Sequence, residues 1–420
     1  MKTKYYSFVG IYLFTFAGLG TLLPLLGQYM ASLGFSGVQI GIVTSAGTAV
    51  GIGASPFWGY RSHHSKDSTK VLLFLCISAT VIILGAALVK QYILFLFTYM
   101  AFTFFQTAIM PLTDAMAIKE QINFGSVRKY GSIGFALGVF VAGQAADAAG
   151  LVIILPFCAM GYTAAWIIMI RLRLSRKKST GKADFKNIDG AIADNQISSI
   201  KASPALNPAG EASAEKKKGK NRASYFMLFK NKKYMALLLS AFFICGTNVA
   251  NNTYFGFLYK DVGGSIAGIG TAFLLMCSSE APFMAWTERL SRRFGMEKLI
   301  LFSLIMSALR YLWYSTGPAP GLLIGTFFVQ GMVTGIVLVE LVRYLNCLVD
   351  RAIIGMSMAL YYAFSSNFSS IVCHLIGGTI LDHYSGAQVY LFFSIYNIIG
   401  ILVFVGFGLH KKNRNDGRKE

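Results

Sequence analysis

The stretch Leu33-Gly34-Phe35-Ser36, followed by Ile40-Gly41, decides the fold of this chain, because its pattern returns in the second half as Val262-Gly263-Gly264-Ser265 and Ile269-Gly270. The correspondence runs at offsets of 226 to 229 residues and continues in Ser55-Pro56-Phe57 against Ala281-Pro282-Phe283, and in Lys70-Val71-Leu72-Leu73-Phe74 against Lys298-Leu299-Ile300-Leu301-Phe302. A third echo pairs Gly143 and Asp147 with Gly378 and Asp382, at the same four-residue step. The chain is therefore interpreted as a duplication of one unit.

The composition places both copies in a membrane. Hydrophobic residues make up 55% of the 420 residues and charged residues 13%, against roughly 25% charged residues in soluble domains. Apolar segments of bilayer-spanning length are predicted at 6–28, 38–60, 70–89, 91–117, 130–149, 151–171, 234–257, 266–288, 298–316, 319–341, 352–376 and 387–409. We expect an all-α membrane protein with twelve transmembrane helices in two six-helix bundles. Parallel repeats of this kind are typical of secondary transporters, whose substrate site lies between the halves near the bilayer midplane.

The formal net charge of +20 follows the alternation of the loops. Nearly all loop lysines and arginines fall on one side of the predicted spans, and the opposite loops hold almost only Lys90 and Lys260. Because basic loops stay in the cytoplasm, we expect a multi-pass protein of the plasma (inner) membrane with both termini cytoplasmic. This placement of the charge speaks against nucleic-acid binding.

One long polar interval divides the chain. Residues 173–232 are dominated by Lys, Ser, Ala, Asn and Gly, which is too little apolar content to fold alone. We interpret them as a flexible basic cytoplasmic linker between an N-terminal six-helix bundle (1–172) and a C-terminal one (233–410), with a cytoplasmic tail at 411–420. A regulatory docking site within the linker is the alternative interpretation.

The sequence offers little for metal or catalytic chemistry. The six cysteines occur singly, with no CxxC spacing, so neither disulfides nor a zinc site nor another cofactor is expected. The HExxH and GxSxG patterns of hydrolases are missing, and we do not expect an enzyme. The expected partners are a small-molecule substrate, protons and the lipid bilayer, with the chain itself a monomer.

Placing an ionisable side chain inside a membrane span costs free energy, so such residues are the first candidates for a functional role. Asp114, Glu280 and Arg310 are the candidates for proton coupling. We interpret Glu280 as the carboxylate that takes up and releases a proton; the alternative is a fixed structural pair with Arg310. Arg310 is also a candidate for an anionic substrate group, because its planar fork suits a carboxylate.

Polar side chains in other spans are candidates for the substrate site and for a gate. The substrate-binding candidates are Asn248, Asn251, Asn252, Gln106, Gln330, Arg310 and Tyr361. Each amide could equally hydrogen-bond a neighbouring helix. Glu340 and Arg343 lie three residues apart at the inner end of their span, the spacing of an ion pair on a helix surface; a cytoplasmic gate is the alternative role.

Several local motifs together are typical of a known family. They are Pro111-Leu112-Thr113-Asp114, Arg128-Lys129-Tyr130-Gly131-Ser132-Ile133-Gly134-Phe135-Ala136, Glu280-Ala281-Pro282, Arg292-Arg293-Phe294-Gly295, Leu309-Arg310-Tyr311, Val329-Gln330-Gly331, and Gly377-Gly378 with Asp382-His383-Tyr384-Ser385-Gly386. Through them the chain resembles the major facilitator superfamily, and within it the group of phenylpropionate permeases, nucleoside:proton symporters and lactose permeases. The resemblance covers nearly the whole chain outside the linker and implies twelve helices, alternating access and proton symport.

Two departures from the pattern of that superfamily bear on its chemistry. His63 stands where an acidic residue is expected after the second span, and the tenth span lacks the His that follows Gln330 in some members of the group. Proton coupling must therefore rest on carboxylates. We expect a proton-coupled symporter that imports a small organic solute. An aromatic carboxylate is favoured by Arg310 and the aromatic residues, a nucleoside or sugar is the alternative suggested by the amides, and a proton-independent uniporter or a drug or metabolite exporter is a further alternative.

Overall fold

The computed structural model describes residues 2–65, 67–122, 124–180, 228, 230–349 and 353–411, and within them the chain is helical with no β-strand. The first half contains α1 (Lys2–Ser32), α2 (Gly37–His63), α3 (Ser68–Ala86), α4 (Tyr92–Gln106), α5 (Ile109–Lys119), α6 (Phe124–Ala149), the short η1 (Leu151–Ile153) and α7 (Ile154–Thr180). The second half contains α9 (Lys232–Asp261), α10 (Ile266–Phe294), α11 (Met296–Tyr314), α12 (Pro320–Leu348), α13 (Ile354–Leu360), the π-helix η3 (Tyr361–Phe368), α14 (Ser369–His383) and α15 (Gly386–Gly406).

The repeated motif at residues 33–36 and 262–265 builds the same turn in each half. Gly34 and Gly263 both have φ of 84°, a left-handed conformation that glycine adopts without steric cost. Ser36 and Ser265 then cap the next helix, each accepting a hydrogen bond from a backbone N–H three residues on. The sequence repeat is therefore a repeat of helix–turn–helix geometry.

The twelve expected spans are confirmed as helices, with longer ends and two interruptions. Eleven stretches of the described chain are long and apolar enough to cross a membrane; α11, which carries Glu297, Lys298 and Arg310, supplies the twelfth span. The span expected at 91–117 is divided into α4 and α5, and the span expected at 352–376 contains the π-helix and continues to His383. Local π-helical geometry is often found at functional positions.

The boundary expected at residue 172 falls inside a helix. α7 continues to Thr180, so the first residues of the expected linker are helical. Most of the expected linker, and the expected tail after residue 411, lie outside the described residues.

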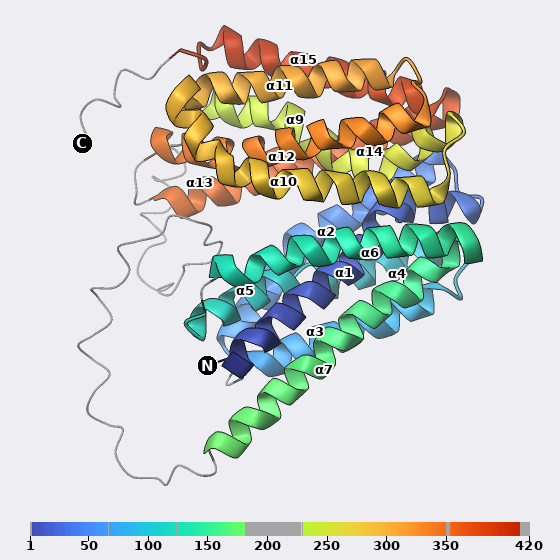
Figure 1. Cartoon of the computed structure of the whole chain (residues 1–420), viewed down its shortest axis with the longest axis vertical. Coiled ribbons are helices and arrows are strands. Elements are labelled where there is room, and N and C mark those ends of the chain that lie inside the picture. The colour runs from blue at the N-terminus through green and yellow to red at the C-terminus, as the bar shows by residue number, and fades with distance from the viewer. Residues whose placement is uncertain are drawn as a thin grey trace.

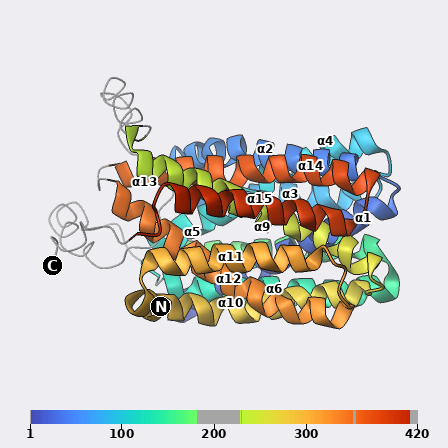
Figure 2. The ribbon, with the colours of Figure 1, turned by 90° about the horizontal axis from the view of Figure 1, so that it is seen from above.

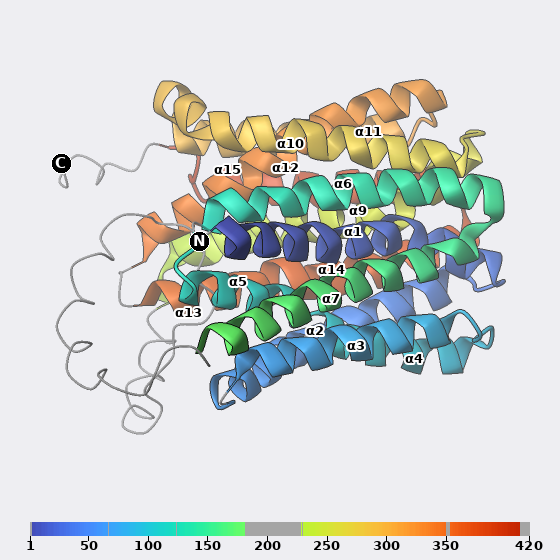
Figure 3. The same cartoon turned by 60° about the horizontal axis from the view of Figure 1, so that its bottom comes forward.

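The helices gather in two groups, α1–α7 and α9–α15, which lie side by side with their long axes roughly parallel (Figure 1). The start of α1 and the end of α15 lie at the same end of the molecule (Figure 1), and we call the opposite end the far end. The halves meet where α2 packs on α14, where α6 packs on α10, and where α1 packs on α9. Figure 2 shows the α2–α14 contact and Figure 3 the α6–α10 contact.

Glycines set how closely these helices approach one another. On α6, a Cβ at Gly134 would lie 2.1 Å from the Leu13 carbonyl oxygen, so this glycine packs α6 on α1 within one half. On the faces between the halves, a Cβ at Gly41 would lie 2.4 Å from the His374 carbonyl oxygen, and one at Gly143 would lie 3.0 Å from the Gly270 Cα. The small faces therefore serve both packing within a half and contact between halves.

Candidate functional site

Two of the three charged residues expected within the spans, Asp114 and Glu280, are influenced by an arginine of α6. The Arg128 guanidinium lies 4.3 Å from the centre of the Phe16 ring on α1, a cation–π distance. Its positive charge acts on the carboxylates of Asp114 on α5 and Glu280 on α10. The charge of Arg128 thus acts on one carboxylate of its own half and on one carboxylate of the other half.

Asp114 is held by a tyrosine of the first helix. The Tyr12 hydroxyl donates a hydrogen bond of 2.5 Å to Asp114 Oδ1, and Tyr12 is almost fully buried whereas Asp114 is only half-buried. The hydrogen bond fixes one oxygen of the carboxylate. The other oxygen remains available to a proton, to water or to a ligand.

Glu280 lies midway along α10 and is half-buried. It forms no salt bridge within the described part of the chain, and Arg128 is the cation whose charge reaches it. Glycines of α12 pack tightly on this turn, because a Cβ at Gly331 or Gly335 would lie 2.9 Å from the Glu280 backbone. The close packing fixes the backbone that carries the carboxylate.

The structure does not bring Arg310 and Glu280 together, which speaks against the alternative of a fixed structural pair between them. Arg310 is 5% exposed, and its guanidinium lies 4.4 Å from the Tyr311 ring centre and 5.3 Å from the Tyr314 ring centre. None of its three side-chain nitrogens has a hydrogen-bond partner among the described residues. Arg310 is therefore enclosed by aromatic rings within the second half, away from the Arg128 group.

Most of the amides predicted to bind substrate are occupied by neighbouring helices. Asn248 Oδ1 accepts hydrogen bonds from Gln330 Nε2 at 3.4 Å and from the Tyr311 hydroxyl at 3.3 Å. Asn251 Oδ1 accepts one from the Tyr390 hydroxyl at 2.8 Å. These contacts lie inside the second half and favour the packing role for the atoms that make them, whereas Asn251 Nδ2 and Gln330 Oε1 have no hydrogen-bond partner among the described residues.

The remaining candidates differ in how they are engaged. Asn252 is half-buried, and no partner is found for it within the described residues. The half-buried Gln106 lies beside Tyr162. The hydroxyl of the buried Tyr361, in the π-helix, lies 3.5 Å from Cys245 Sγ on α9. Of these three residues, Asn252 is therefore the one without an identified side-chain contact in the described part of the chain.

The expected gate residues are an ion pair inside one half. Arg343 Nη1 lies 3.7 Å from Glu340 Oε1 on the same helix. The Ser291 hydroxyl on α10 donates a hydrogen bond of 3.2 Å to the other Glu340 oxygen. The described contacts of Glu340 tie α12 to α10 within the second half, which is the arrangement of a structural pair.

Contacts between the halves close the far end, and they use the aspartates of the third sequence echo. Asp382, near the end of α14, accepts hydrogen bonds from the first two N–H groups of α2, those of Gly37 and Val38, the latter at 2.8 Å. Asp147, near the end of α6, accepts one from the Ile266 N–H at the start of α10, at 3.0 Å. A carboxylate is stabilised at a helix N-terminus by the unpaired N–H groups and the helix dipole. Each half thus contributes one aspartate to an N-terminus of the other half.

Two functional features were missed or left without a role at the level of sequence. The action of Arg128 on Glu280 was not predicted, although the position of Arg128 within a glycine-rich helical pattern beside Tyr130 and Gly131 was a usable signal. Asp147 and Asp382 were found as a repeat, but only the folded chain shows that both aspartates point across the interface. The repeat itself was the signal.

Comparison with known proteins extends over nearly the whole chain. Residues 5–392 match the model of the MFS_1 like family. The maltose permease of Geobacillus stearothermophilus is 29% identical over 414 residues, covering 97% of this chain and 95% of that protein. The probable 3-phenylpropionic acid transporter of Escherichia coli strain K12 is 22% identical over 70% of each chain. Among solved structures, the nucleoside transporter NupG has a TM-score of 0.75 at 16% identity, covering 97% of this chain and 99% of that one.

Proposed function

Because the chain belongs to the MFS_1 like family of membrane transporters, we propose that it is a secondary active symporter that couples proton entry to the import of a neutral, polyhydroxylated solute of the sugar class. The observation that carries the proposal is that the charge of Arg128 acts on both Asp114 and Glu280, which belong to different halves. A change in the protonation of one carboxylate alters the electrostatic balance across the interface that must open and close.

Glu280 is the residue that we assign to the proton, with Asp114 assisting it. A proton that moves down about 100 mV supplies roughly 2.3 kcal/mol, and each pH unit of gradient adds about 1.36 kcal/mol. One titrating carboxylate therefore suffices for a solute gradient of a few hundredfold. Arg128, and not the enclosed Arg310, is the cation that the geometry offers to tune it.

The charge around Arg128 favours a neutral solute. With Glu280 protonated, the charge of Arg128 is still balanced by Asp114, so an added carboxylate would find no unbalanced cation. Sugar hydroxyls can donate to the carboxylates and accept from the guanidinium, and the Phe16 ring supplies an apolar face. The relationship to a maltose permease along nearly the full length of both chains agrees with this choice.

An aromatic carboxylate is the second candidate. It was favoured on the assumption that Arg310 meets the acid group, and the enclosure of Arg310 removes that support. Arg128 over the Phe16 ring is an alternative receptor for such a molecule, and the similarity to a probable 3-phenylpropionic acid transporter is in keeping with it. Nucleosides are the third candidate class, because the half-buried amides of Asn252 and Gln106 could hydrogen-bond them.

The closed far end supports the alternating-access part of the proposal. The aspartate contacts and the glycine faces join the halves at that end. The side chains of Asp114 and Arg128, nearer the other end, and of Glu280, midway along α10, keep partial exposure. We assign this arrangement to an inward-facing state. Our proposal also includes bundle boundaries near residues 172 and 233 and an inner-membrane location. It places both termini in the cytoplasm, because basic residues lie beside the start of α1.

The test is uptake of labelled maltose into proteoliposomes under an imposed inward proton gradient. Unlabelled glucose, phenylpropionate and uridine serve as competitors. We expect proton-driven accumulation in the parent protein, its loss in Glu280→Gln, and its retention in Glu288→Gln, because Glu288 is an exposed residue of the same helix paired with Arg292. Unchanged accumulation in Glu280→Gln would refute the proton assignment, and competition by phenylpropionate alone would replace the sugar with the aromatic acid.

A further inference from the structure

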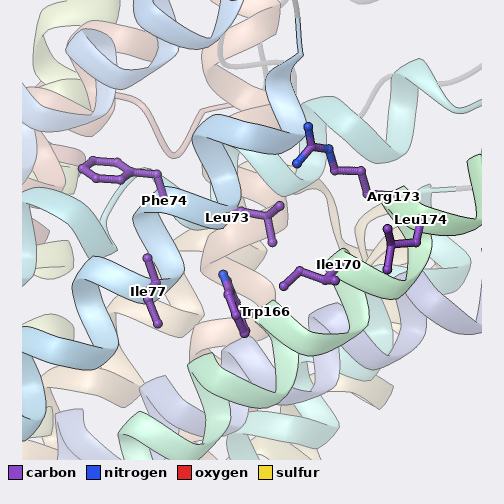
Figure 4. A pocket seen from close by; sticks show the side chains of 7 residues that line it. All are labelled: Leu73, Phe74, Ile77, Trp166, Ile170, Arg173 and Leu174. Carbon is purple, nitrogen blue, oxygen red and sulfur yellow. The ribbon is translucent and has the colours of Figure 1, made fainter. Parts of the chain in front are cut away.

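A groove of about 380 Å³ runs between α3 and α7 on the outer surface of the first half. Leu73 and Ile77 of α3 line one side, and Trp166 and Ile170 of α7 line the other. Figure 4 shows these side chains facing one another, with Arg173 at the end of the row. The groove is thus apolar along its length and cationic at one end.

The surroundings of the groove are those of a surface that contacts lipid. Phe74 is 50% exposed and Leu174 is 56% exposed at its margins, and Val81 further along α3 is 61% exposed. Large apolar side chains with this exposure are stable next to hydrocarbon and not next to water. An acyl chain is therefore the natural occupant of the apolar part.

The cationic end is arranged for an anionic group. Arg173 Nε lies 3.2 Å from Asp67 Oδ2, while the other Asp67 oxygen accepts the Thr69 N–H at the start of α3, at 3.0 Å. Asp67 is fixed by this cap, so it orients the guanidinium and engages only its Nε edge. The terminal nitrogens of Arg173 have no hydrogen-bond partner among the described residues, and Lys70 is exposed one turn before Leu73.

We propose that this groove binds an anionic glycerophospholipid, with one acyl chain between α3 and α7 and the phosphate on Arg173 and Lys70. Trp166 and Arg173 are seven residues apart on one helix, about 10 Å along its axis. This distance fits within the hydrocarbon of one leaflet, which is about 15 Å thick. Arginine presents parallel N–H groups to phosphate oxygens. Basic pockets between transmembrane helices at the cytoplasmic side are known lipid headgroup sites.

The experiment is native mass spectrometry of the full chain in detergent, titrated with phosphatidylglycerol and, separately, with phosphatidylcholine. Arg173→Gln removes the proposed phosphate ligand. Arg171→Gln is the matched control, because Arg171 is an exposed cation two residues away on the same helix and lies on a different face. Ile170→Trp fills the groove and leaves every charge in place. Thermal unfolding in lipid-free detergent establishes that each variant is folded.

We expect the parent protein and Arg171→Gln to retain phosphatidylglycerol over phosphatidylcholine. Arg173→Gln should lower the affinity for phosphatidylglycerol about tenfold, equal to about 1.4 kcal/mol, and Ile170→Trp should lower retention of both lipids. Equal retention by Arg173→Gln and Arg171→Gln would overturn the headgroup site. Undiminished retention by Ile170→Trp would overturn the groove as the place of the acyl chain, even if Arg173→Gln failed to fold.

Discussion

Removing the Asp382 carboxylate tests whether the far end is held shut by the aspartate contacts. Asp382→Ala deletes both hydrogen bonds to the start of α2, those from the Gly37 and Val38 N–H groups. The backbone of α14 is unaffected, because the residue lies in its last turn. The state closed at the far end loses a contact that the open state does not make, so the equilibrium moves toward opening at that end.

The size of the shift follows from the exposure of the contact. Hydrogen bonds to charged groups contribute about 1.5 to 3 kcal/mol each when shielded. Asp382 is exposed, water replaces the lost partners, and salt screens the charge, so about 1 kcal/mol is expected for the pair. That corresponds to about a fivefold change in the ratio of the two states. Asp147→Ala removes the second contact, and because the two sites share no partner their effects should add.

Spin labels on the far end of each half give the readout. Lys90 between α3 and α4 and Thr316 between α11 and α12 are exposed, and cysteines at both positions place one label on each half. Electron paramagnetic resonance then gives the distribution of distances between the halves. We expect a longer-distance population that grows about fivefold in Asp382→Ala and further in the double variant with Asp147→Ala.

Asp261 supplies the control. Its carboxylate accepts a hydrogen bond of 3.0 Å from the Gly386 N–H at the start of α15, so the chemistry is the same but both partners belong to the second half. Asp261→Ala should lower thermal stability and leave the distance distribution unchanged. If Asp382→Ala and Asp261→Ala gave the same distribution, the aspartate contacts would not be what closes the far end.

Three other variants test separate steps of the argument. Gly41→Ala should also favour opening at the far end, because its Cβ would lie 2.4 Å from the α14 backbone. The same spin labels give the readout. Gly53→Ala on the same helix is the control, because its Cβ would have nothing within 4 Å and should leave the distances unchanged. Tyr12→Phe should slow proton-driven uptake about tenfold through the lost hydrogen bond to Asp114, and an unchanged rate would remove Tyr12 from the site. Arg310→Met should leave proton-driven uptake intact and the thermal midpoint equal or higher, because a buried charge with no hydrogen-bond partner is replaced by an apolar side chain. Loss of uptake in a folded Arg310→Met protein would show that Arg310 takes part in coupling.

The sequence carried most of the fold because the signals that define it are local. Span length, glycine at the turn and serine at the helix cap act within a few residues. The repeat of Gly34 and Ser36 as Gly263 and Ser265 therefore predicted one unit built twice, and both copies form the same turn. The break between α4 and α5 and the π-helix in η3 were not predicted. Both depend on packing against other helices, which apolar periodicity does not report.

The candidate site was less predictable because its geometry depends on which face of each helix meets the other half. Asp114 and Glu280 were found from their cost in a membrane, which is a property of the residue alone. The sequence did not show which arginine acts on Glu280, because Arg128 and Arg310 look alike in sequence and differ only in what surrounds them. Arg128 is half-buried and its charge acts on two carboxylates, whereas Arg310 is enclosed by tyrosine rings.

The hydrogen bonds that close the far end are donated by backbone N–H groups. The donors therefore do not depend on side-chain identity. Nearly any residue can stand at position 266 and still offer an N–H to Asp147, with proline as the exception. Proline is well accepted at the first position of a helix, and Ser265 already has the extended conformation, φ −87° and ψ 160°, that a following proline requires. Ile266→Pro would therefore remove the N–H group that donates to Asp147 and keep the helix. A substitution at this position can thus shift the equilibrium between the two states without changing any charge.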